Sequence, residues 1–577
     1  MKKNIILICI IAIGSFLRFN NLSLVPPSAS LDEVSIGYNA YSLSKTGVDE
    51  YGTKFPILLR AYDDWRPALY VYLVIPFIKL FGLNVVSVRL PSVILSILTI
   101  IVTYFLAKEL FSNSRWKLEI GNWKLEIPEV TSLLLAISPW HVYISRLGHE
   151  VNAGLAFIIF AILFFIKAMN NLNKKFYLFI AVVFFSLSLY TYQSEKVFVP
   201  LIILVLGFVY RKSLLKIKKE LLIFILLGIV LIIPMITSTL TPHGLTRFKG
   251  TSAFLENSLY RESAEKVLAY RNEGNIFGEI LNNRRLVPIK IFAINYFSHF
   301  NPKFLFFNSG DESFKAPDIG LMYIWEFPFI IGGIVFLLRS LVDTKIKTII
   351  LGWLLIAFVA PSISTGAPHA MRAYNLIPIP QILVALGLWQ VISFLKYKVL
   401  SSKHYVFGGL LYTFLLIFNI SVLYFFKQYF YVFPKNQSVS FQYALSEAIP
   451  FVLKRESGYN KIVFSNRDNL YQSYMFFLFY SKYDPFLYQK QGGTKSGGFA
   501  QAHKFGKYEF RAIEWEKDGL ISNTLFVGND SDFPRDLKSK FFTNLDGKGV
   551  IEVVHNKEWT YNIYKDTAKR TYSAKAS

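Results

Sequence analysis

Cysteine is almost absent from this sequence, since Cys9 is the only one among 577 residues. A single cysteine excludes a disulfide framework and a zinc site built from cysteines. Histidine is scarce too: the eight histidines include no His-x-x-x-His pair, and no Asp-x-Asp triplet stands near the acidic residues at 32 and 33. The sequence therefore carries no metal signature, and a divalent cation held by Asp32 and Glu150 is an alternative that no motif supports.

Acidic residues are few relative to basic ones, with 38 against 62 and a net charge of +24. In a soluble protein this excess would suggest a nucleic-acid partner. Here the lysines and arginines stand mainly in short stretches between long apolar runs, which is the distribution expected of a membrane protein. We therefore expect no nucleic-acid partner.

Apolar runs dominate the chain, which is 53% hydrophobic and 17% aromatic. Several runs approach the roughly 20 residues that cross a bilayer as a helix, more than one soluble core could bury. The first run lacks a small-x-small cleavage site, so we expect an uncleaved helix rather than a signal peptide. The hydrophobic pattern predicts about eleven spans, at residues 4–20, 90–110, 130–147, 152–170, 176–192, 197–210, 220–238, 321–339, 347–364, 375–395 and 405–426.

The distribution of basic residues orients these spans. If the N-terminus is cytoplasmic, every cytoplasmic connection is basic, and the chain is a multi-pass plasma-membrane protein with its C-terminal region outside. The short run Pro67–Gly82 is interrupted by Pro76, and counting it as a span would place the basic connections outside. We therefore expect Pro67–Gly82 to form a helix at the outer membrane surface, and the same interpretation suits Val287–Phe307.

The predicted fold is mainly α, with a polytopic helical bundle over residues 1–428 and a small extracytoplasmic α/β domain over 429–577. The bundle carries two long outer loops, at 20–90 and 239–320, and the size of the latter suggests a lid or an acceptor platform. In the C-terminal domain, alternating runs predict strands, and one run predicts a helix that Pro450 should kink or divide. The strands are expected at Lys461–Ser465, Thr524–Gly528, Gly549–Val554 and Thr560–Tyr564, and the helix at Ser440–Glu456.

Two smaller patterns receive a structural interpretation. Trp-Lys-Leu-Glu-Ile occurs at 116–120 and again at 123–127, a local duplication too short for a solenoid. Gly492–Gly498 is rich in glycine but lacks the spacing of a phosphate-binding loop, so we expect a flexible surface loop.

Asp32 and Glu33 form an acidic pair just after the first span, among small and aromatic residues. One interpretation is structural: they are loop carboxylates, with Asp32 as the cap of a helix that starts near Val34. The other is catalytic: they are a general base and a partner that orients the base or a substrate. A carboxylate near the low-dielectric edge of a membrane is readily raised in pKa, which favours base chemistry.

Further polar residues gather at the predicted outer ends of the spans. Arginines there can bind a lipid phosphate in bidentate fashion or simply lie at the membrane interface, and the group at 146–150 can form a shared site or a helix terminus that meets water. Two cations one helical turn apart, at 369 and 372, could clasp one phosphate. The candidates are Asp32, Glu33 and Glu150 for catalysis and Arg66, Arg89, Arg146, His149, Gln193, Lys196, His369 and Arg372 for substrate or phosphate binding; the 239–320 loop adds His243, Arg247, Asp311 and Glu312.

The stretch Leu-Asp-Glu-x-x-x-x-Tyr-Asn-Ala-Tyr at 31–41, which follows an N-terminal span, resembles the GT-C superfamily of polyprenyl-phosphate-sugar glycosyltransferases. The nearest groups are protein O-mannosyltransferase-like and aminoarabinose-transferase-like enzymes, of the glycosyltransferase family 39 type, and the similarity covers about residues 1–400. Arg66-Pro67-Ala68-Leu69 resembles the family's Lys/His-Pro-Pro-Leu element but departs from it at the first and third positions. The C-terminal domain matches no acceptor-binding module.

The resemblance implies that the acidic pair supplies the catalytic base, which would be Asp32 with Glu33 beside it. It also implies that Arg89 is the family's following arginine and that Glu150 is its second acidic motif. The expected reaction is an inverting transfer of a monosaccharide from a polyprenyl-phosphate donor to a hydroxyl of a protein, glycan or lipid on the outer face, with no cofactor required. The alternatives are a lipid or sugar transporter, whose midplane charges and internal repeat are not visible here, and a non-catalytic anchor that presents the C-terminal domain.

Overall fold

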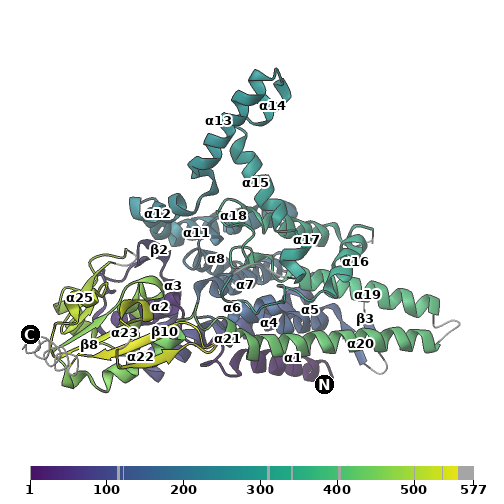
Figure 1. The fold of residues 1–577 in the computed structure, drawn as a ribbon. Helices are drawn as coiled ribbons and strands as arrows, with labels where there is room; N and C mark the ends of the chain where they lie inside the picture. Colours follow the sequence, from purple (N-terminus) through teal and green to yellow (C-terminus); the bar gives the residue numbers. More distant parts are fainter. Residues whose placement is uncertain are drawn as a thin grey trace, which may run out of the picture. The chain divides into compact units, whose positions relative to one another are not determined.

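The structure, a computed structural model, describes residues 2–112, 117–120, 123–307, 312–339, 342–399, 404–498, 501–535 and 537–556. Contacts between residues divide the chain into two units: the first contains residues 1–20, 66–69 and 92–428, and the second contains residues 21–65, 70–91 and 429–577. The second unit therefore combines most of the first predicted outer loop with the C-terminal region. Figure 1 labels many of the helices and strands of both units.

The first unit is built from helices, and each predicted span falls mainly on one helix or, at 130–147, 347–364 and 375–395, on two consecutive helices. The helices are α1 (Lys2–Phe19), α4 (Val85–Leu110), α5 (Ile127–Ile137), α6 (Pro139–Ser145), α7 (Glu150–Asn170), α8 (Lys175–Leu189), α9 (Glu195–Val209), α10 (Arg211–Lys216), α11 (Lys218–Thr239), α12 (Pro242–Thr251), η1 (Ala253–Leu255), α13 (Asn257–Asn272), α14 (Ile276–Leu281), α15 (Val287–Ser298), η2 (Lys303–Phe307), α16 (Glu326–Arg339), α17 (Thr344–Ile356), α18 (Val359–Ser362), η3 (Tyr374–Leu376), α19 (Ile379–Val399) and α20 (His404–Lys427).

Within the described ranges, six helical segments are long and apolar enough to cross a membrane. The number of about eleven spans stays a prediction, because other apolar helices, such as Asn4–Phe19 and Lys175–Leu189, are shorter. The six segments are Val85–Leu110, Glu150–Asn170, Lys218–Thr239, Thr344–Ser362, Tyr374–Phe394 and Gly408–Asn436.

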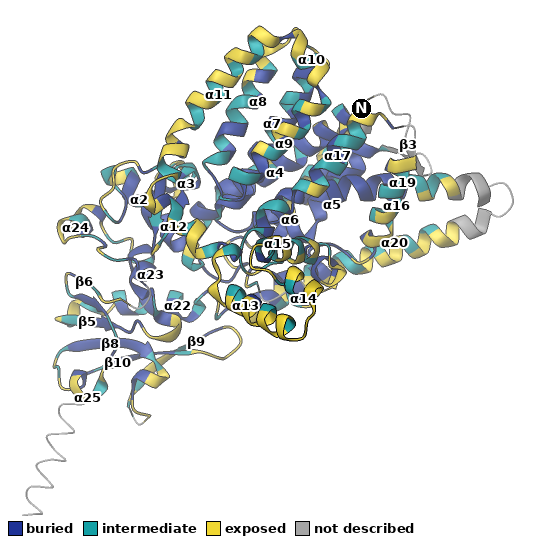
Figure 2. Ribbon diagram, turned by 90° about the horizontal axis from the view of Figure 1, so that it is seen from above, coloured by how far each residue is buried: buried dark blue, intermediate teal, exposed yellow. Residues whose placement is uncertain are grey.

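Burial distinguishes the helices of the first unit. The apolar window of α7 is 78% buried, whereas those of α11 and α20 are only 6% buried. Figure 2 shows this contrast, with α7 in dark blue and long exposed stretches on α11 and α20. A helix that is apolar all round but unburied by protein requires a lipid environment, so α11 and α20 are placed to contact the bilayer.

Proline and glycine explain two local features of this unit. The predicted span at 130–147 breaks between α5 and α6 because Pro139 has no N–H and disfavours a helical conformation at Ser138. Small residues bring α16 and α19 together: a Cβ added to Gly333 would lie 2.0 Å from the Leu383 carbonyl oxygen. Small residues at helix crossings allow such backbone approach in membrane proteins.

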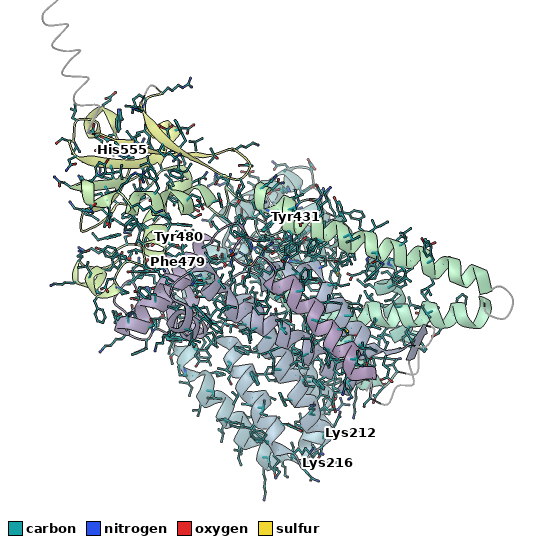
Figure 3. All side chains as sticks on the ribbon, turned by 90° about the horizontal axis from the view of Figure 1, so that it is seen from below. Lys212, Lys216, Tyr431, Phe479, Tyr480 and His555 are labelled. Carbon is teal, nitrogen blue, oxygen red and sulfur yellow. The ribbon has the colours of Figure 1, made fainter. Side chains whose placement is uncertain are left out.

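The connections between these helices include two structured segments. The two Trp-Lys-Leu-Glu-Ile copies pair as an antiparallel hairpin of β3 (Lys117–Ile120) and β4 (Trp123–Glu126). The short basic helix α10 joins α9 to α11, and Figure 3 shows its Lys212 and Lys216 at the tip of these helices. The predicted 239–320 loop is largely helical, and α13 and α14 extend outward from α15 (Figure 1).

The second unit contains a six-stranded mixed sheet in the order β6-β7-β5-β8-β10-β9. Its central strand β5 is parallel to both neighbours, with Val463 opposite Glu509 in β7 and opposite Phe526 in β8; the other pairs are antiparallel. The strands are β5 (Lys461–Phe464), β6 (His503–Phe505), β7 (Tyr508–Phe510), β8 (Thr524–Asn529), β9 (Ser539–Thr543) and β10 (Val550–His555).

Helices of this unit pack on the sheet and on one another. From the first outer loop come α2 (Leu31–Thr46), the hairpin of β1 (Leu58–Ala61) and β2 (Asp64–Pro67), and α3 (Leu69–Phe81). The C-terminal region adds α22, which packs against β9, β10 and α23. Its helices are α21 (Phe433–Asn436), α22 (Tyr443–Leu453), α23 (Ser473–Tyr480), α24 (Pro485–Lys490) and α25 (Trp515–Asp518), with short turns η5 (Glu456–Gly458), η6 (Asp468–Leu470) and η7 (Asp530–Asp532).

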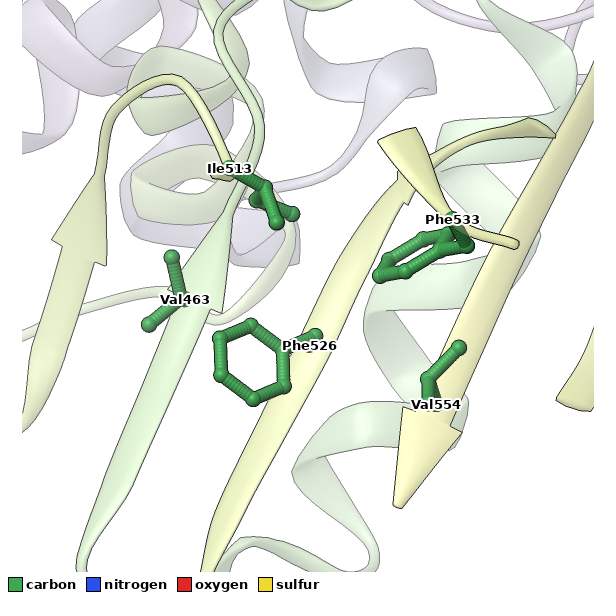
Figure 4. Packing of buried hydrophobic residues seen from close by; sticks show 5 residues of the cluster. All are labelled: Val463, Ile513, Phe526, Phe533 and Val554. Carbon is green, nitrogen blue, oxygen red and sulfur yellow. The ribbon is translucent and has the colours of Figure 1, made fainter. Parts of the chain in front are cut away.

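Three of the four predicted strands are confirmed, as β5, β8 and β10, and Thr560–Tyr564 lies outside the described residues. Alternation did not reveal β6, β7 and β9, because β6 and β7 have three residues each and β9 is largely solvent-facing. The predicted helix is α22, and Pro450 does not divide it. Figure 4 shows part of the core, where Val463, Phe526 and Val554 from three strands meet Ile513 and Phe533.

Within this unit, α2 packs closely against α23. A Cβ added to Gly37 on α2 would lie 2.4 Å from Phe479 Cε2 and 2.8 Å from Val88 Cγ2. Real Cβ atoms do not approach aromatic carbons this closely, and buried rings in a dense core cannot easily move aside. The position therefore requires glycine.

We expect Gly37→Ala to lower the free energy of unfolding by about 1–3 kcal/mol through overpacking. Gly207→Ala is the matched control, because Gly207 lies in α9 with nothing within 4 Å of an added Cβ. The control should be neutral or slightly stabilising, as alanine favours helix over glycine by about 1 kcal/mol. Thermal denaturation of the purified variants measures both effects, and equal stability of the two variants would contradict the packing described here.

Candidate active site

The acidic pair lies in the first turn of α2, which begins at Leu31 rather than near Val34. Ser30 is the cap: its Oγ accepts a hydrogen bond from the Glu33 N–H at 3.2 Å, and Glu33 Oε2 accepts one from the Ser30 N–H at 2.8 Å. This reciprocal arrangement is a capping box, which satisfies two otherwise orphaned donors. The interpretation of Asp32 as the helix cap is therefore wrong.

Glu33 is buried and forms a two-pronged ion pair with Arg89 of α4. Arg89 Nε donates to Glu33 Oε1 at 2.7 Å, and Nη2 donates to Oε2 at 3.0 Å. Arg89 also donates Nη1 to the carbonyls of Leu22 and Pro26, at 2.8 and 3.0 Å, and Nη2 to that of Ser28 at 2.6 Å. A guanidinium has five N–H donors, so these contacts use all of them. The geometry favours a positioning role for Arg89, which ties α2 to α4, over its predicted phosphate-binding role.

Asp32 differs from Glu33 because its side chain is exposed. It lies at the positive end of the α2 dipole, which stabilises the ionised form that a general base needs. Tyr471 lies close enough to Asp32 for their charges to interact. The pKa of Tyr471 is raised mainly by burial and to a smaller extent by the negative charge of Asp32. Asp32 stays the candidate base, and Tyr471 is a neighbour that no sequence pattern indicated.

A second buried carboxylate, Glu50, fixes the segment after α2. Asn39 Nδ2, Thr494 Oγ1 and Tyr474 OH donate hydrogen bonds to it at 3.0, 2.7 and 3.2 Å. Burial raises the pKa of Glu50 to about 7, although these hydrogen bonds act to lower it. Thr494 also donates its N–H to the Glu50 carbonyl at 2.9 Å, so Gly492–Gly498 is packed against this segment rather than free at the surface, contrary to the prediction.

In the first unit, Arg146 is fully buried at the end of α6. Its Nη1 donates to the carbonyls of Leu17 and Arg18, both at 2.9 Å, and its Nη2 donates to that of Asn20 at 2.7 Å. These carbonyls belong to the last turn of α1 and the residue after it, where a helix presents its negative end. Arg146 thus caps α1, and its predicted role in substrate binding stays a prediction.

His149 and Glu150 begin α7. His149 caps this helix, since its Nδ1 accepts a hydrogen bond from the Val151 N–H at 3.3 Å. The same Nδ1 lies 3.5 Å from Glu150 Oε2. The imidazole ring packs edge-on against Tyr192, with 5.7 Å between the centroids. Glu150 itself is 5% exposed, and its catalytic role stays a prediction.

A cavity of about 250 Å³ lies between the start of α9, the end of α11, α12 and the segment after α18. Its lining contains three basic side chains, Lys196, Arg247 and Arg372, and no acidic one. Gln193 lines it as well, so four residues that the sequence marked as candidates meet here. Arg247 was visible in the sequence only as one ionisable residue of a long loop, since nothing in its spacing placed it beside Lys196 and Arg372. We call this the cationic pocket.

Hydroxyl groups orient two of these cations. Lys196 Nζ donates to Thr239 Oγ1 at 2.9 Å, and Arg372 Nη1 donates to Ser364 Oγ at 2.8 Å and to the Thr365 carbonyl. Neither contact neutralises the positive charge. The cationic pocket therefore offers an anion several positively charged donors.

The segment from 366 to 373 forms turns, and the Ala373 N–H donates to the His369 carbonyl at 3.1 Å. The predicted clasp of one phosphate by His369 and Arg372 stays a prediction. His369 Nδ1 lies 2.9 Å from Glu312 Oε1, and Lys315 Nζ lies 2.5 Å from Glu312 Oε2. Although burial raises the pKa of Glu312, His369 and Lys315 outweigh it and hold that pKa below its usual value. Asp311 lies outside the described residues.

An apolar groove of about 260 Å³ runs along the same helices as the cationic pocket. It is lined by α8, by Val199, Ile203 and Leu206 of α9, and by the stretch 221–232 of α11. Helix α9 thus contributes residue 196 to the cationic pocket and residue 203 to the groove, about 10 Å further along the helix axis. A phosphate attached to a long apolar chain has this combination of properties.

The last predicted residue, Arg66, lies in β2 and is 5% exposed. Its phosphate-binding role stays a prediction. Among the residues that the structure describes, no three His, Cys, Asp or Glu side chains form a group that could hold a metal ion.

Comparisons with known proteins agree with the fold and with part of the sequence. The family model described as "Dolichyl-phosphate-mannose-protein mannosyltransferase" matches residues 66–237. Among solved structures, ArnT from Cupriavidus metallidurans bound to undecaprenyl phosphate is similar, with 12% identity, a TM-score of 0.53 and coverage of 96% of this chain and 98% of that one. A comparison with curated protein sequences finds no match.

The oligosaccharyltransferase of Archaeoglobus fulgidus, solved with a tethered acceptor peptide, is also similar, with 14% identity and a TM-score of 0.50. The match covers 82% of this chain but only 62% of that protein, so this chain spans less than two thirds of its length. Identities this low establish the fold alone. Together, the matched segment and the fold support the predicted resemblance: residues 66–237 match the mannosyltransferase family model, and the chain has the fold of GT-C membrane enzymes.

Proposed function

We propose that this protein transfers a monosaccharide from a polyprenyl-phosphate donor to an acceptor hydroxyl on the outer face of the plasma membrane, with the N-terminus cytoplasmic. The observation that carries the proposal is the cationic pocket beside an apolar groove on shared helices. A sugar nucleotide would need no apolar groove, and a neutral lipid would need no cluster of cations. A lipid-linked phosphate uses both features.

In the proposed reaction, Asp32 takes the proton from the acceptor hydroxyl. The acceptor oxygen attacks the anomeric carbon as the bond from that carbon to the phosphate oxygen breaks, so the configuration inverts. The leaving polyprenyl phosphate carries away the electron pair. Lys196, Arg247 and Arg372 are assigned to stabilise the negative charge that develops on it, because fixed cations lower the energy of such a transition state.

The three basic residues provide the test. We expect Arg372→Gln and Arg247→Gln each to raise the KM for the donor by about 10- to 100-fold, since a charge-assisted hydrogen bond contributes about 1.5–3 kcal/mol. Lys249→Gln is the matched control: it lies on α12 like Arg247 but is exposed and does not line the pocket. Initial rates at varied donor concentration give KM and kcat separately. An unchanged donor KM in both variants would remove the cationic pocket from donor binding.

A further inference from the structure

The C-terminal part of the second unit contains a cavity of about 480 Å³ that the proposed transfer does not involve. Its lining comes from the segments that directly follow three neighbouring strands: Arg467 after β5, residues 513–517 after β7, and residues 531–534 after β8. Because β5 is parallel to β7 and to β8, the carboxyl ends of all three strands lie at one edge of the sheet.

The strand order makes this edge a candidate ligand site. After β5 the chain continues to β7 on one side of it and then to β8 on the other side, so the direction of winding reverses at β5. In open α/β sheets, ligands bind outside the carboxyl ends of the strands at such a reversal. The position of the cavity is therefore the one that the topology predicts for a binding site.

An aromatic side chain with a fixed orientation lines the cavity. Trp515 packs edge-to-face against Phe526 and Phe533, with centroid distances of 5.4 and 5.3 Å. Both phenylalanines belong to the buried cluster of Figure 4, which also contains Ile513. Trp515 is only half-buried, so the cluster anchors an indole that still presents apolar surface to the cavity.

The cavity lining carries charges of both signs. Two lining residues are basic, Arg467 and Lys517, and three are acidic, Glu514, Glu516 and Asp532. An anion would meet three carboxylates there, and a cation would meet a guanidinium and an ammonium group. A neutral ligand with both hydrogen-bond donors and acceptors can use both sets of side chains.

Asp532 adds a specific acceptor. Its side chain is fully buried, and its Oδ2 accepts a hydrogen bond from the Asn529 N–H at 2.9 Å. No residue that the structure describes donates a hydrogen bond to its Oδ1, which lies 3.7 Å from Arg467 Nη1. A buried carboxylate oxygen without a hydrogen bond costs free energy that a ligand hydroxyl would recover.

We propose that this cavity binds a neutral saccharide. An apolar sugar face packs on the indole of Trp515, and hydroxyl groups donate to Asp532 and accept from Arg467. This combination of one aromatic surface with a few placed polar groups is typical of small-molecule sites. The site is separate from Asp32 and from the cationic pocket in the residues that form it, so it goes beyond the proposed transfer.

The test uses the full-length protein in amphipol, because maltoside detergents carry a disaccharide that would compete. Saturation-transfer NMR with a panel of neutral oligosaccharides, followed by titration, measures binding without any donor. We expect wild type to bind at least one saccharide, and Trp515→Ala and Arg467→Gln each to weaken that binding by at least tenfold. Arg467 is about half exposed, so its replacement does not disturb the core if Trp515→Ala fails to fold.

Two controls locate the site. Phe541→Ala removes an exposed aromatic side chain of the same sheet, and Asp32→Asn alters the proposed base; both should bind as wild type does. Absence of binding to every saccharide would overturn the proposal. Binding that persists in Arg467→Gln and is lost in Asp32→Asn would also overturn it, because the saccharide would then occupy the transfer site.

Discussion

Asp32→Asn is expected to reduce the rate of sugar transfer by about 100- to 10,000-fold, the range that a positioned general base contributes. The amide side chain has nearly the same shape as the carboxylate, but it cannot take the proton from the hydroxyl group of the acceptor substrate. Since Asp32 is exposed and the capping box uses Ser30 and Glu33 instead, the variant should fold as wild type does. Transfer of labelled sugar by purified protein, with kcat and KM determined separately, measures the loss.

A suitable control for this substitution is Asp63→Asn, which alters an exposed aspartate that pairs only loosely with Arg60, at 3.4 Å. Its transfer rate should stay within about twofold of wild type, as expected for surface changes away from a site. Full activity of Asp32→Asn would exclude Asp32 as the base.

Arg89→Met is expected to lower the free energy of unfolding by about 3–5 kcal/mol, the usual effect of removing one partner from a buried ion pair. The substitution leaves the Glu33 carboxylate buried without its counter-charge and frees three loop carbonyls, those of Leu22, Pro26 and Ser28. Denaturation monitored by tryptophan fluorescence in micelles measures the change. Because Arg89 holds the start of α2, transfer activity should fall with stability.

Two further variants separate this positioning role from phosphate binding. Arg60→Met removes an exposed ion pair and should cost no more than about 1 kcal/mol. The double variant Glu33→Gln with Arg89→Met should be more stable than Arg89→Met alone, because no unpaired charge is left buried. If Arg89→Met instead kept wild-type stability and raised only the donor KM, Arg89 would be a phosphate ligand, as its residue type and position in the sequence predicted.

Much of the helical architecture could be predicted from the sequence, because an apolar run of membrane length must satisfy its backbone hydrogen bonds internally and therefore forms a helix. The break at Pro139 was also within reach, since proline removes an N–H and restricts the residue before it. The capping box was visible as well: Ser30-Leu-Asp-Glu33 has the Ser-x-x-Glu spacing that marks a helix start. This spacing predicts a helix that starts directly after Ser30, with Glu33 rather than Asp32 in the capping box.

Other features depend on contacts between distant parts of the chain. The pairing of Glu33 with Arg89 joins residues 56 positions apart, and either side chain alone is compatible with several roles. Arg247 reaches the cationic pocket only because α12 folds back toward α9 and α11. The strands β6 and β7 have three residues each, too few to show an alternating pattern in the sequence. Without β7, the sequence does not reveal that the carboxyl ends of β5, β7 and β8 lie at one edge of the sheet.

The most direct measurement is sugar transfer from a panel of polyprenyl-phosphate monosaccharides to acceptors in membranes that contain the wild-type protein, with the anomeric configuration of the product determined by NMR. The account predicts that one donor is consumed and that the new glycosidic bond has the inverted configuration. Consumption of no donor by folded protein, or a product with retained configuration, would contradict it.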